Sequence, residues 1–325
     1  MLALCMTVKN EEKLLAQNLR YHRAAGVDAF YIFDDGSTDG TVASVRSMPD
    51  VTISSSVDPA LFLDHPDFSR VVARAHELIT ARQVLNSHTA FQHAKAAGHQ
   101  WMISLDADEL LYLEDGRGIE GSLTRFFNTV RPEIDTILFK PAELIPCRME
   151  AKNPFAENSF FHTIPRRNGR EIHDPYSDKP QSINSFIGHA MGKSAARIRD
   201  HILHKTVHTF TSSDGRELNR FEARWLLHYN IHSFGNFIQK YQRFHGHPET
   251  YLTGAKIEIP RSLWIRMVND SHFDRDFLLD YYQRWVASDA TGEDGVRQFE
   301  EVSDFFRGCL KNAKTQRISC STQRT

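Results

Sequence analysis

The chain has 325 residues, of which 41% are hydrophobic and 25% are charged, and its formal net charge is −2. This is an ordinary composition for a soluble globular protein, with enough apolar residues for one large core or two smaller ones. The near balance of charge argues against nucleic acid as the main partner, because a phosphate backbone is bound through a basic excess. The four cysteines are scattered without ligand-like spacing, so neither a zinc site nor a disulfide framework is predicted.

The apolar stretches are too short for a transmembrane helix, which needs about 18 apolar residues or more. The first residues, MLALCMTV, already resemble a core strand, and this leaves no room for a signal peptide. We therefore predict a cytoplasmic protein whose association with a membrane, if it has one, is peripheral.

Strand and helix patterns alternate over the first 48 residues. The apolar runs at 2–8 and 29–35 are typical of buried strands, and residues 9–27 carry leucines at helical spacing before Gly26, which has the position of a helix C-cap. A turn and a short helical pattern follow at 36–48. This order predicts a parallel sheet with right-handed crossovers, and therefore one half of an α/β nucleotide-binding domain.

Further along the chain, residues 70–98 are predicted to form two helices, and residues 135–144 a strand. Residues 146–192 are rich in Pro, Gly, Asn and Ser without clear periodicity, which is typical of functional or disordered loops. The aromatic-rich segment 220–244 has an amphipathic helical pattern. The predicted parts are an α/β domain over 1–213, with a nucleotide-binding half at 1–115 and an acceptor half at 116–213, a helical region over 214–310, and a polar, fraying tail over 311–325.

Three polar motifs stand where predicted strands end: TVKNEE at 7–12, FDDGSTDGT at 33–41 and LDADEL at 105–110. Ligands of open α/β sheets bind at the carboxyl ends of the strands, so the three motifs are expected to line one cleft. Asp106 and Asp108 are hard oxygen ligands of the kind that suit Mg²⁺ or Mn²⁺. The alternative for each motif on its own is a solvated strand end or a well-capped loop.

The segments MTVKNEE, FDDGSTDGT and WMISLDADEL, in this order and spacing, resemble family 2 glycosyltransferases of the GT-A fold, in the branch that carries D-x-D-E after W-x-x-x-x. The resemblance covers residues 1–115 well and residues 180–245 more weakly, through GKSAARI, VH and HYNIHSFGNFIQK. It implies an α/β fold of the GT-A (Rossmann-like) type, with a mostly parallel central sheet and a helical C-terminal region. It also implies that a nucleotide-diphosphate sugar lies across the strand ends.

The same resemblance implies a role for each of the polar residues at the strand ends. A divalent ion, Mn²⁺ or Mg²⁺, is expected between Asp106 and the catalytic Asp108, where it neutralises charge on the leaving diphosphate. The role of Glu109, directly after the pair, stays open as a structural or supporting one. The residues expected to hold the nucleoside are Thr7, Val8, Asn10, Glu11 and Asp35.

A histidine in the second half of such a domain often completes the metal site, and the Val207–His208 match points to His208. The alternative is a polar surface cluster of His208 with His201 and His204.

Four further residues are predicted near the donor. Lys193 and Arg197 fit as counter-charges to phosphate, and the alternative is a solvated basic face. Arg82 and Gln83 fit as hydrogen-bond donors near the nucleotide, and the alternative is that they belong to an ordinary helix surface.

An inverting transfer, which the resemblance implies, needs a carboxylate that takes the proton of the acceptor hydroxyl. Glu171, Asp174 and Asp178 lie in the irregular middle of the chain, and Asp174 is ranked first because HDPYSD is a polar loop that enters the second half.

The resulting prediction is a metal-dependent glycosyltransferase that moves a sugar from a nucleotide-diphosphate sugar, with a UDP-sugar favoured, to a glycan, polysaccharide or lipid-linked acceptor. Two alternatives stay open: a nucleotidyltransferase on a similar sheet, and a sugar-nucleotide-binding or scaffold protein without turnover. The oligomeric state is not predicted.

Overall fold

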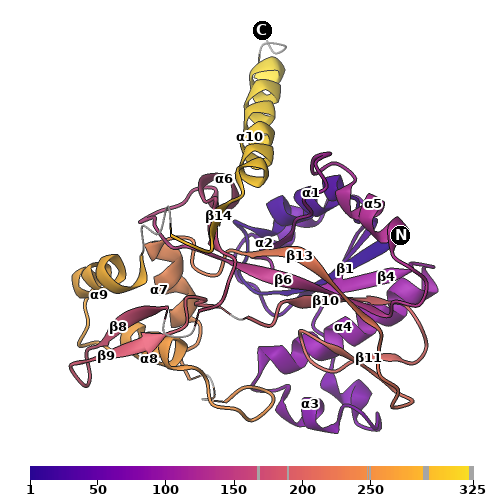
Figure 1. Cartoon of the computed structure of the whole chain (residues 1–325), viewed down its shortest axis with the longest axis horizontal. Helices are drawn as coiled ribbons and strands as arrows, with labels where there is room; N and C mark the ends of the chain where they lie inside the picture. Colours follow the sequence, from indigo (N-terminus) through magenta and orange to yellow (C-terminus); the bar gives the residue numbers. More distant parts are fainter. Residues whose placement is uncertain (167–168, 189, 247, 249, 288–292, 322–325) are drawn as a thin grey trace.

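The computed structural model describes residues 1–325 except 167–168, 189, 247, 249, 288–292 and 322–325. Its centre is one ten-stranded sheet with helices on both faces (Figure 1). The first half of the sheet is parallel, in the order β3-β2-β1-β4. Its strands are β1 (Leu2–Val8), β2 (Ala29–Asp34), β3 (Val51–Ser55) and β4 (Trp101–Ser104).

The crossover helices of this half follow from the sequence pattern. Helix α1 (Leu15–Ala25) buries Leu15 and Leu19 against the sheet and ends at Gly26, whose φ of 107° is the left-handed conformation of a helix C-cap. Two helices, α3 (Ser69–Arg74) and α4 (Ile79–Ala96), lie within the segment where two were predicted.

The second half of the sheet is mixed. Strand β10 (Lys193–Arg197) runs antiparallel between β4 and β6 (Thr136–Leu144). Strand β13 (Arg220–His228) is parallel to β6, and β5 (Glu109–Leu111) pairs antiparallel with β13. The predicted α/β class is therefore confirmed, and the parallel pairing predicted for the sheet holds for its first half, β3-β2-β1-β4.

The helical prediction for residues 220–244 is wrong over its first part. Residues 220–228 form β13, in which the first three residues are exposed and the last four are buried. The cause is tertiary pairing. Strand β13 pairs with β6 along its length, and its last three residues also pair with β5, so they lie between two strands. Helix α7 (Phe234–Gln242) begins only after Ser233, whose Oγ accepts from the N–H of Asn236 as an N-cap.

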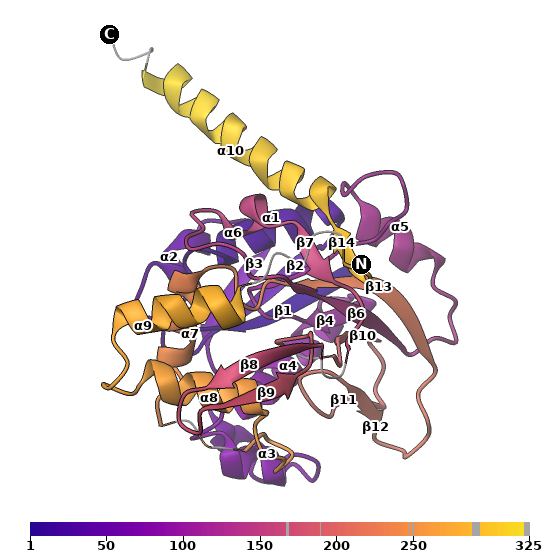
Figure 2. The same ribbon diagram turned by 60° about the vertical axis from the view of Figure 1, so that its left-hand side comes forward.

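A second hydrophobic cluster forms beside the sheet. It joins α7 to α8 (Ile259–Val268), α9 (Arg275–Tyr281) and the hairpin of β8 (Arg170–Asp174) and β9 (Lys179–Ile183), around the buried Trp264. Figures 1 and 2 both place these elements on one side of the molecule. The hairpin lies in the segment for which no periodicity was found, because short strands of an exposed hairpin carry little apolar pattern.

Helix α10 (Glu300–Ser321) projects from the body (Figure 1). Residues 311–321, within the segment predicted to fray, continue this helix. Its first turns are anchored by Phe306, whose ring stacks on Phe155 and Tyr21. The remaining elements are α2 (Thr41–Val45), η1 (Pro59–Phe62), α5 (Ser122–Thr129), α6 (Pro154–Glu157), β7 (Phe160–His162), β11 (Ile202–His204), β12 (Phe210–Ser212), η2 (Tyr282–Val286) and β14 (Val296–Gln298).

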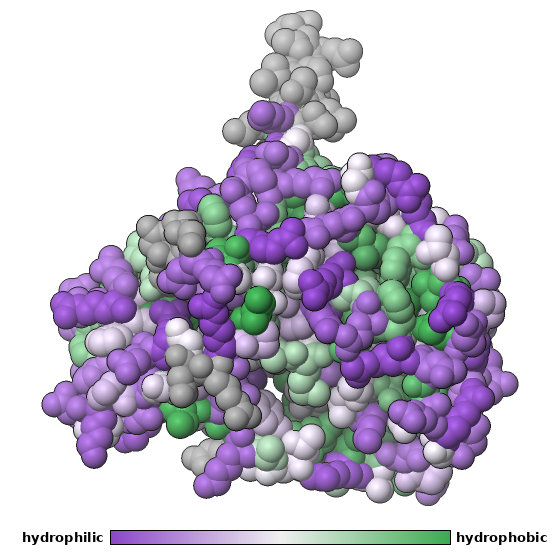
Figure 3. Space-filling view, in the orientation of Figure 1, coloured by the Kyte–Doolittle hydropathy of each residue, from purple (hydrophilic) through white to green (hydrophobic). Residues whose placement is uncertain are grey.

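The face shown in Figure 3 is mainly hydrophilic, and its hydrophobic side chains are interspersed with polar ones. Within the described part of the chain, none of the helices combines the length and the apolar character that crossing a bilayer requires.

Replacement of Phe306 by alanine is expected to lower the free energy of unfolding by about 3–5 kcal/mol, because a buried aromatic ring is lost and a cavity is left. Leu310→Ala, on an exposed position of the same helix, is the matched control and should change it by less than about 0.5 kcal/mol. Urea unfolding followed by tryptophan fluorescence measures both. Equal, small effects would mean that α10 is not anchored through Phe306.

Candidate functional site

The ends of β1 and β2 are joined by backbone and side-chain hydrogen bonds. Asn10 has a φ of 57°, a left-handed conformation that asparagine tolerates better than most residues. Its N–H donates to Ser37 Oγ over 2.9 Å, and its Oδ1 accepts from the N–H of Thr38 over 2.7 Å. Two of the three polar motifs are thus held side by side, as the sequence predicts.

Thr7 and Val8 form the end of the buried strand β1. Asn86 of α4 donates to Thr7 Oγ1 over 2.9 Å, and the carbonyl of Val8 accepts from the N–H of Asp35 over 2.8 Å. The carboxylate of Asp35 accepts two hydrogen bonds from Arg82, at 2.6 and 2.7 Å. Arg82 and Asp35 therefore do meet at this edge, in a bidentate pair with each other.

Glu11 continues the same loop. Its N–H donates to Thr41 Oγ1 over 2.7 Å, and its carboxylate accepts from Arg243 of α7 over 2.9 Å. Burial, together with the nearby charge of Asp108, raises its pKa to about 7, although Arg243 opposes this shift. The carboxyl group of Glu11 therefore titrates near neutral pH.

Asp106 stands at the end of β4, with both carboxylate oxygens engaged. Gln83 donates to Oδ1 over 2.7 Å and Lys193 donates to Oδ2 over 2.9 Å. Burial would raise the pKa of Asp106, but Lys193 outweighs it and lowers that pKa. Gln83 and Lys193, which the sequence predicts near the nucleotide and the phosphates, are thus both hydrogen-bonded to Asp106.

Lys193 itself is enclosed by carboxylates. Its Nζ lies 3.3 Å from Glu109 Oε2, and Glu109 also accepts from the N–H of Asp106 over 2.8 Å. Burial alone would lower the pKa of Lys193, but Asp106 and Glu109 raise it, so the lysine is charged. Glu109 is thus a fully buried partner of Lys193, and burial raises the pKa of its carboxyl group.

Asp108 faces two other cations. Its Oδ2 lies 3.2 Å from Lys240 Nζ and 3.7 Å from His228 Nε2. On its other side His228 binds Glu143, with 2.6 Å between Nδ1 and Oε1. Burial opposes ionisation, but Lys240 and His228 hold the pKa of Asp108 well below its usual value, and Glu143 with Asp108 raises the pKa of His228 well above its own.

Three residues predicted from the sequence have other surroundings. Arg197 lies at the opposite end of β10, about 13 Å from Lys193 at about 3.3 Å per strand residue. Its guanidinium stacks over the ring of Trp101 and donates to the carbonyls of residues 130, 131 and 134. This corrects the assignment of Arg197 to the phosphates. Because β10 runs antiparallel to β4, Arg197 pairs with Trp101 at the start of β4, away from the acidic residues that follow its end.

His208 and Asp174 are each engaged locally. The Nδ1 of His208 binds the carbonyl of Gly192 over 2.8 Å, which places the ring beside the start of β10. The carboxylate of Asp174 accepts from the N–H of Tyr176 and from Ser177 Oγ within the turn of the β8–β9 hairpin. The histidine that stands beside the acidic pair is His228.

The site predicted from the sequence does not include Glu143, His228, Lys240 or Arg243, although the HYNIHSFGNFIQK segment contains two of them. The strand alternation in RFEARWLLH was a usable signal for His228, because it places that residue at a strand end. The contacts of Lys240 and Arg243 had no signal in the sequence, since they join residues more than 130 positions apart.

The residues at the acidic pair do not, as arranged, form a site for a divalent ion. Ammonium groups lie at hydrogen-bond distance from the carboxylate oxygens that such an ion needs. In the described ranges, no three His, Cys, Asp or Glu side chains stand together in a metal-binding group. The three-ligand site predicted from Asp106, Asp108 and His208 is therefore not present in this arrangement.

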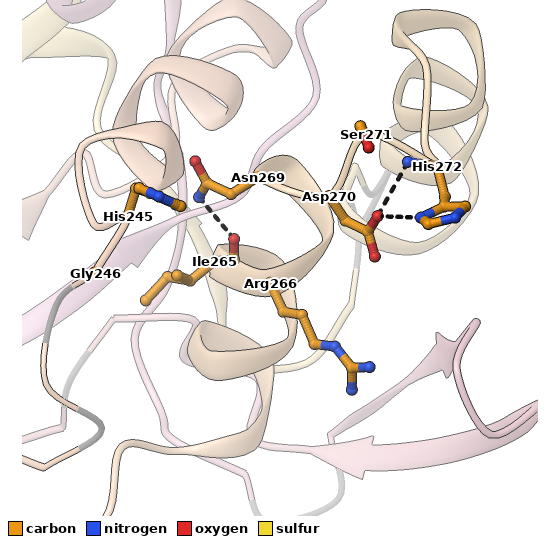
Figure 4. A pocket seen from close by; sticks show the side chains of 8 residues that line it. All are labelled: His245, Gly246, Ile265, Arg266, Asn269, Asp270, Ser271 and His272. Carbon is orange, nitrogen blue, oxygen red and sulfur yellow. Dashed lines mark hydrogen bonds and ion pairs between the residues drawn. The ribbon is translucent and has the colours of Figure 1, made fainter.

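A surface hollow lies at the ends of α7 and α8, separate from the acidic pair (Figure 4). It is lined by polar groups, among them Asn269, which donates to the carbonyl of Ile265, and Asp270, which accepts from the N–H and ring of His272. The guanidinium of Arg266 stacks on Tyr176, 3.5 Å from the ring centre.

Comparison with known proteins gives two curated relatives from Arabidopsis thaliana, both named glycosyltransferase-like. One is 25% identical over 300 residues, which is 86% of this chain and 61% of the relative; the other is 23% identical over 295 residues, or 86% and 53%. The chain thus spans between half and two thirds of the length of these relatives. No family model matches.

Solved structures also show similarity. One is glucosyl-3-phosphoglycerate synthase from Mycobacterium tuberculosis in complex with Mn²⁺, UDP and glucosyl-3-phosphoglycerate, at 13% identity over 44% of each chain and a TM-score of 0.25. Another is mannosyl-3-phosphoglycerate synthase from Rubrobacter xylanophilus, at 12% identity over 44% of this chain and 40% of that one and a TM-score of 0.28. Similarity of this size carries no argument for function.

Lys193→Met is expected to lower the free energy of unfolding by about 3–5 kcal/mol, because it leaves Glu109 buried without its counter-ion. Lys95→Met is the matched control: Lys95 pairs with Asp200 at the exposed surface, where an ion pair contributes about 0–1 kcal/mol. Chemical unfolding of both variants decides between the two effects. A small loss for Lys193→Met would show that Lys193 does not hold the end of β4 together.

Proposed function

We propose that this chain is a glycosyltransferase that takes its sugar from a nucleotide-diphosphate sugar, with a UDP-sugar as the favoured donor. The observation that carries the proposal is the joining of three polar strand ends, Asn10, Asp35 and Asp106 with Asp108, at one edge of an α/β sheet. That edge is where such sheets bind nucleotides. Similarity to glycosyltransferase-like proteins over 86% of the chain supports the same class.

In this proposal the loop from Thr7 to Glu11 and the Asp35–Arg82 pair position the nucleoside, and the sugar-diphosphate lies toward Asp106 and Asp108. The acceptor is a glycan, polysaccharide or lipid-linked sugar, and the transfer is an inverting single displacement in the cytoplasm. Arg82 and Asp35 fix each other bidentately, so the nucleoside would meet a preformed surface.

The proposed metal dependence needs its own test. Mn²⁺ or Mg²⁺ is the cation predicted from the sequence, but the aspartates of this arrangement already accept hydrogen bonds from Lys193 and Lys240. No step is therefore assigned to a metal.

A binding protein without turnover is the second candidate function. The observation that favours it is the neutralisation of both aspartates by lysines of the same chain. Slow hydrolysis of the donor separates the two, because an active transferase also passes its sugar to water.

A panel of UDP-, GDP-, dTDP- and CMP-sugars is expected to give hydrolysis with one nucleotide class. Asp106→Ala/Asp108→Ala should reduce the rate at least about 100-fold, since charge stabilisation at the diphosphate is lost. The exposed Asp200→Ala is the control, and each reaction is run with added Mn²⁺ and with chelator. Donor binding without hydrolysis in either buffer would support the binding protein instead.

Asp174→Asn tests the proposed base. Loss of a general base lowers kcat by about 10²- to 10⁴-fold with little change in the KM for the donor. Asp276→Asn, at an exposed position in the first turn of α9, is the control. If the Asp174 variant loses only thermal stability and keeps its kcat, then Asp174 serves the turn and is not the base.

A further inference from the structure

We propose that Lys240 and Arg243 of α7 are the residues that bind the diphosphate of the donor. The inference rests on the proposed function and extends it to a surface that neither the motifs nor the relatives assign. These two residues lie on the polar side of α7, and we call them the α7 cation pair.

The cation pair is carried by a firmly held helix. The apolar side of α7 buries Phe234, Phe237 and Tyr241, and the last two pack edge-on against Trp264 of α8. Lys240 and Arg243 are three positions apart, so they project from the same side of the helix and its C-terminal end. Figure 1 shows α7 on the side of the helical layer that faces the sheet.

Each cation of the pair reaches one strand end of the site. Lys240 Nζ lies 3.2 Å from Asp108 Oδ2, and 2.8 and 2.5 Å from the carbonyl and side-chain oxygens of Asn230. Arg243 donates to the carbonyls of Lys9 and Asn10, over 3.2 and 2.7 Å, and to Glu11. Because β4 and β1 are neighbours in the sheet, the two cations stand side by side over the edge where the diphosphate of the donor would lie.

The Lys240–Asp108 and Arg243–Glu11 ion pairs are exposed enough for a ligand to replace the carboxylate partner. The side chains of Lys240 and Asp108 are 24% and 18% exposed, and those of Arg243 and Glu11 are 30% and 26% exposed. The Lys193–Glu109 pair is 2% and 0% exposed, and is part of the core. Partly exposed pairs contribute little net stability, whereas phosphate oxygens make strong charge-assisted hydrogen bonds to lysine and arginine. A diphosphate therefore competes well for Lys240 and Arg243, and poorly for Lys193.

The other predicted cations of the site are already committed. Arg82, although 23% exposed, is held by both oxygens of Asp35, a carboxylate that is only 6% exposed, and Arg197 lies at the far end of β10 over Trp101. Two positive charges on α7 match the two negative charges of a nucleotide-diphosphate sugar. Arginine offers a fork that fits a phosphate group, and lysine offers a compact charge.

The experiment is calorimetric titration of the full chain with UDP and, separately, with uridine. Lys240→Met and Arg243→Met should each weaken UDP binding about 10- to 100-fold. Lys240→Met should leave uridine binding unchanged, because uridine has no phosphate. Lys240→Arg and Arg243→Lys should regain part of the loss. Arg275→Met is the matched control: Arg275 stacks on Phe234 of the same helix and contacts neither strand end.

The outcomes are distinct. If UDP does not bind the unaltered chain, and no other nucleoside diphosphate does, the proposed function itself fails. If UDP binds and the Lys240 and Arg243 variants bind it equally well, the proposed function stands and this inference is overturned.

A second measurement on the unaltered chain covers variants that do not fold. UDP should slow acetylation of Lys240, measured by mass spectrometry, and should leave the exposed Lys95 unaffected. Acetylation of Lys240 at the same rate with and without bound UDP would overturn the inference.

Discussion

The ion pair between Lys193 and the acidic turn after β4 is the interaction on which the rest of the site depends. Asp106, Asp108 and Glu109 place three carboxylates within four residues at the end of a buried strand. Left alone, these charges would repel one another and would be costly to remove from water. Lys193 lies between Asp106 and Glu109, and it reaches them because β10 runs antiparallel to β4 and starts at that edge. The antiparallel direction of β10 is therefore what brings the positive charge of Lys193 to these carboxylates.

A second network of charge continues from the first. Glu143 of β6 binds His228 at the end of β13, and His228 and Lys240 both face Asp108. Every charge in this chain of contacts has an opposite partner, contributed by a different element of the fold. The cations around Asp106 and Asp108 lower the pKa of both carboxyl groups, which favours their ionised form.

The helical layer is connected to this network through one helix. Its own apolar cluster, around Trp264, fixes α7 independently of the sheet. Lys240 and Arg243 then span the distance to β4 and β1. A layer with its own apolar cluster, joined to the strand ends by partly exposed ion pairs, is suited to holding a ligand between the two parts. The hollow of Figure 4 lies at the end of the same helix.

The sequence by itself determined the parallel half of the sheet, the cap at Gly26 and the convergence of Asn10, Asp35 and Asp106 at one edge. These follow from local apolar patterns and from the rule that parallel strands end together. Only the tertiary structure decided that residues 220–228 form a strand, that Arg197 points away while Lys193 points in, and that His228 lies beside Asp108. The reason is physical: strand direction and ion pairing between distant segments depend on which elements become neighbours, and no local pattern of residues encodes that choice.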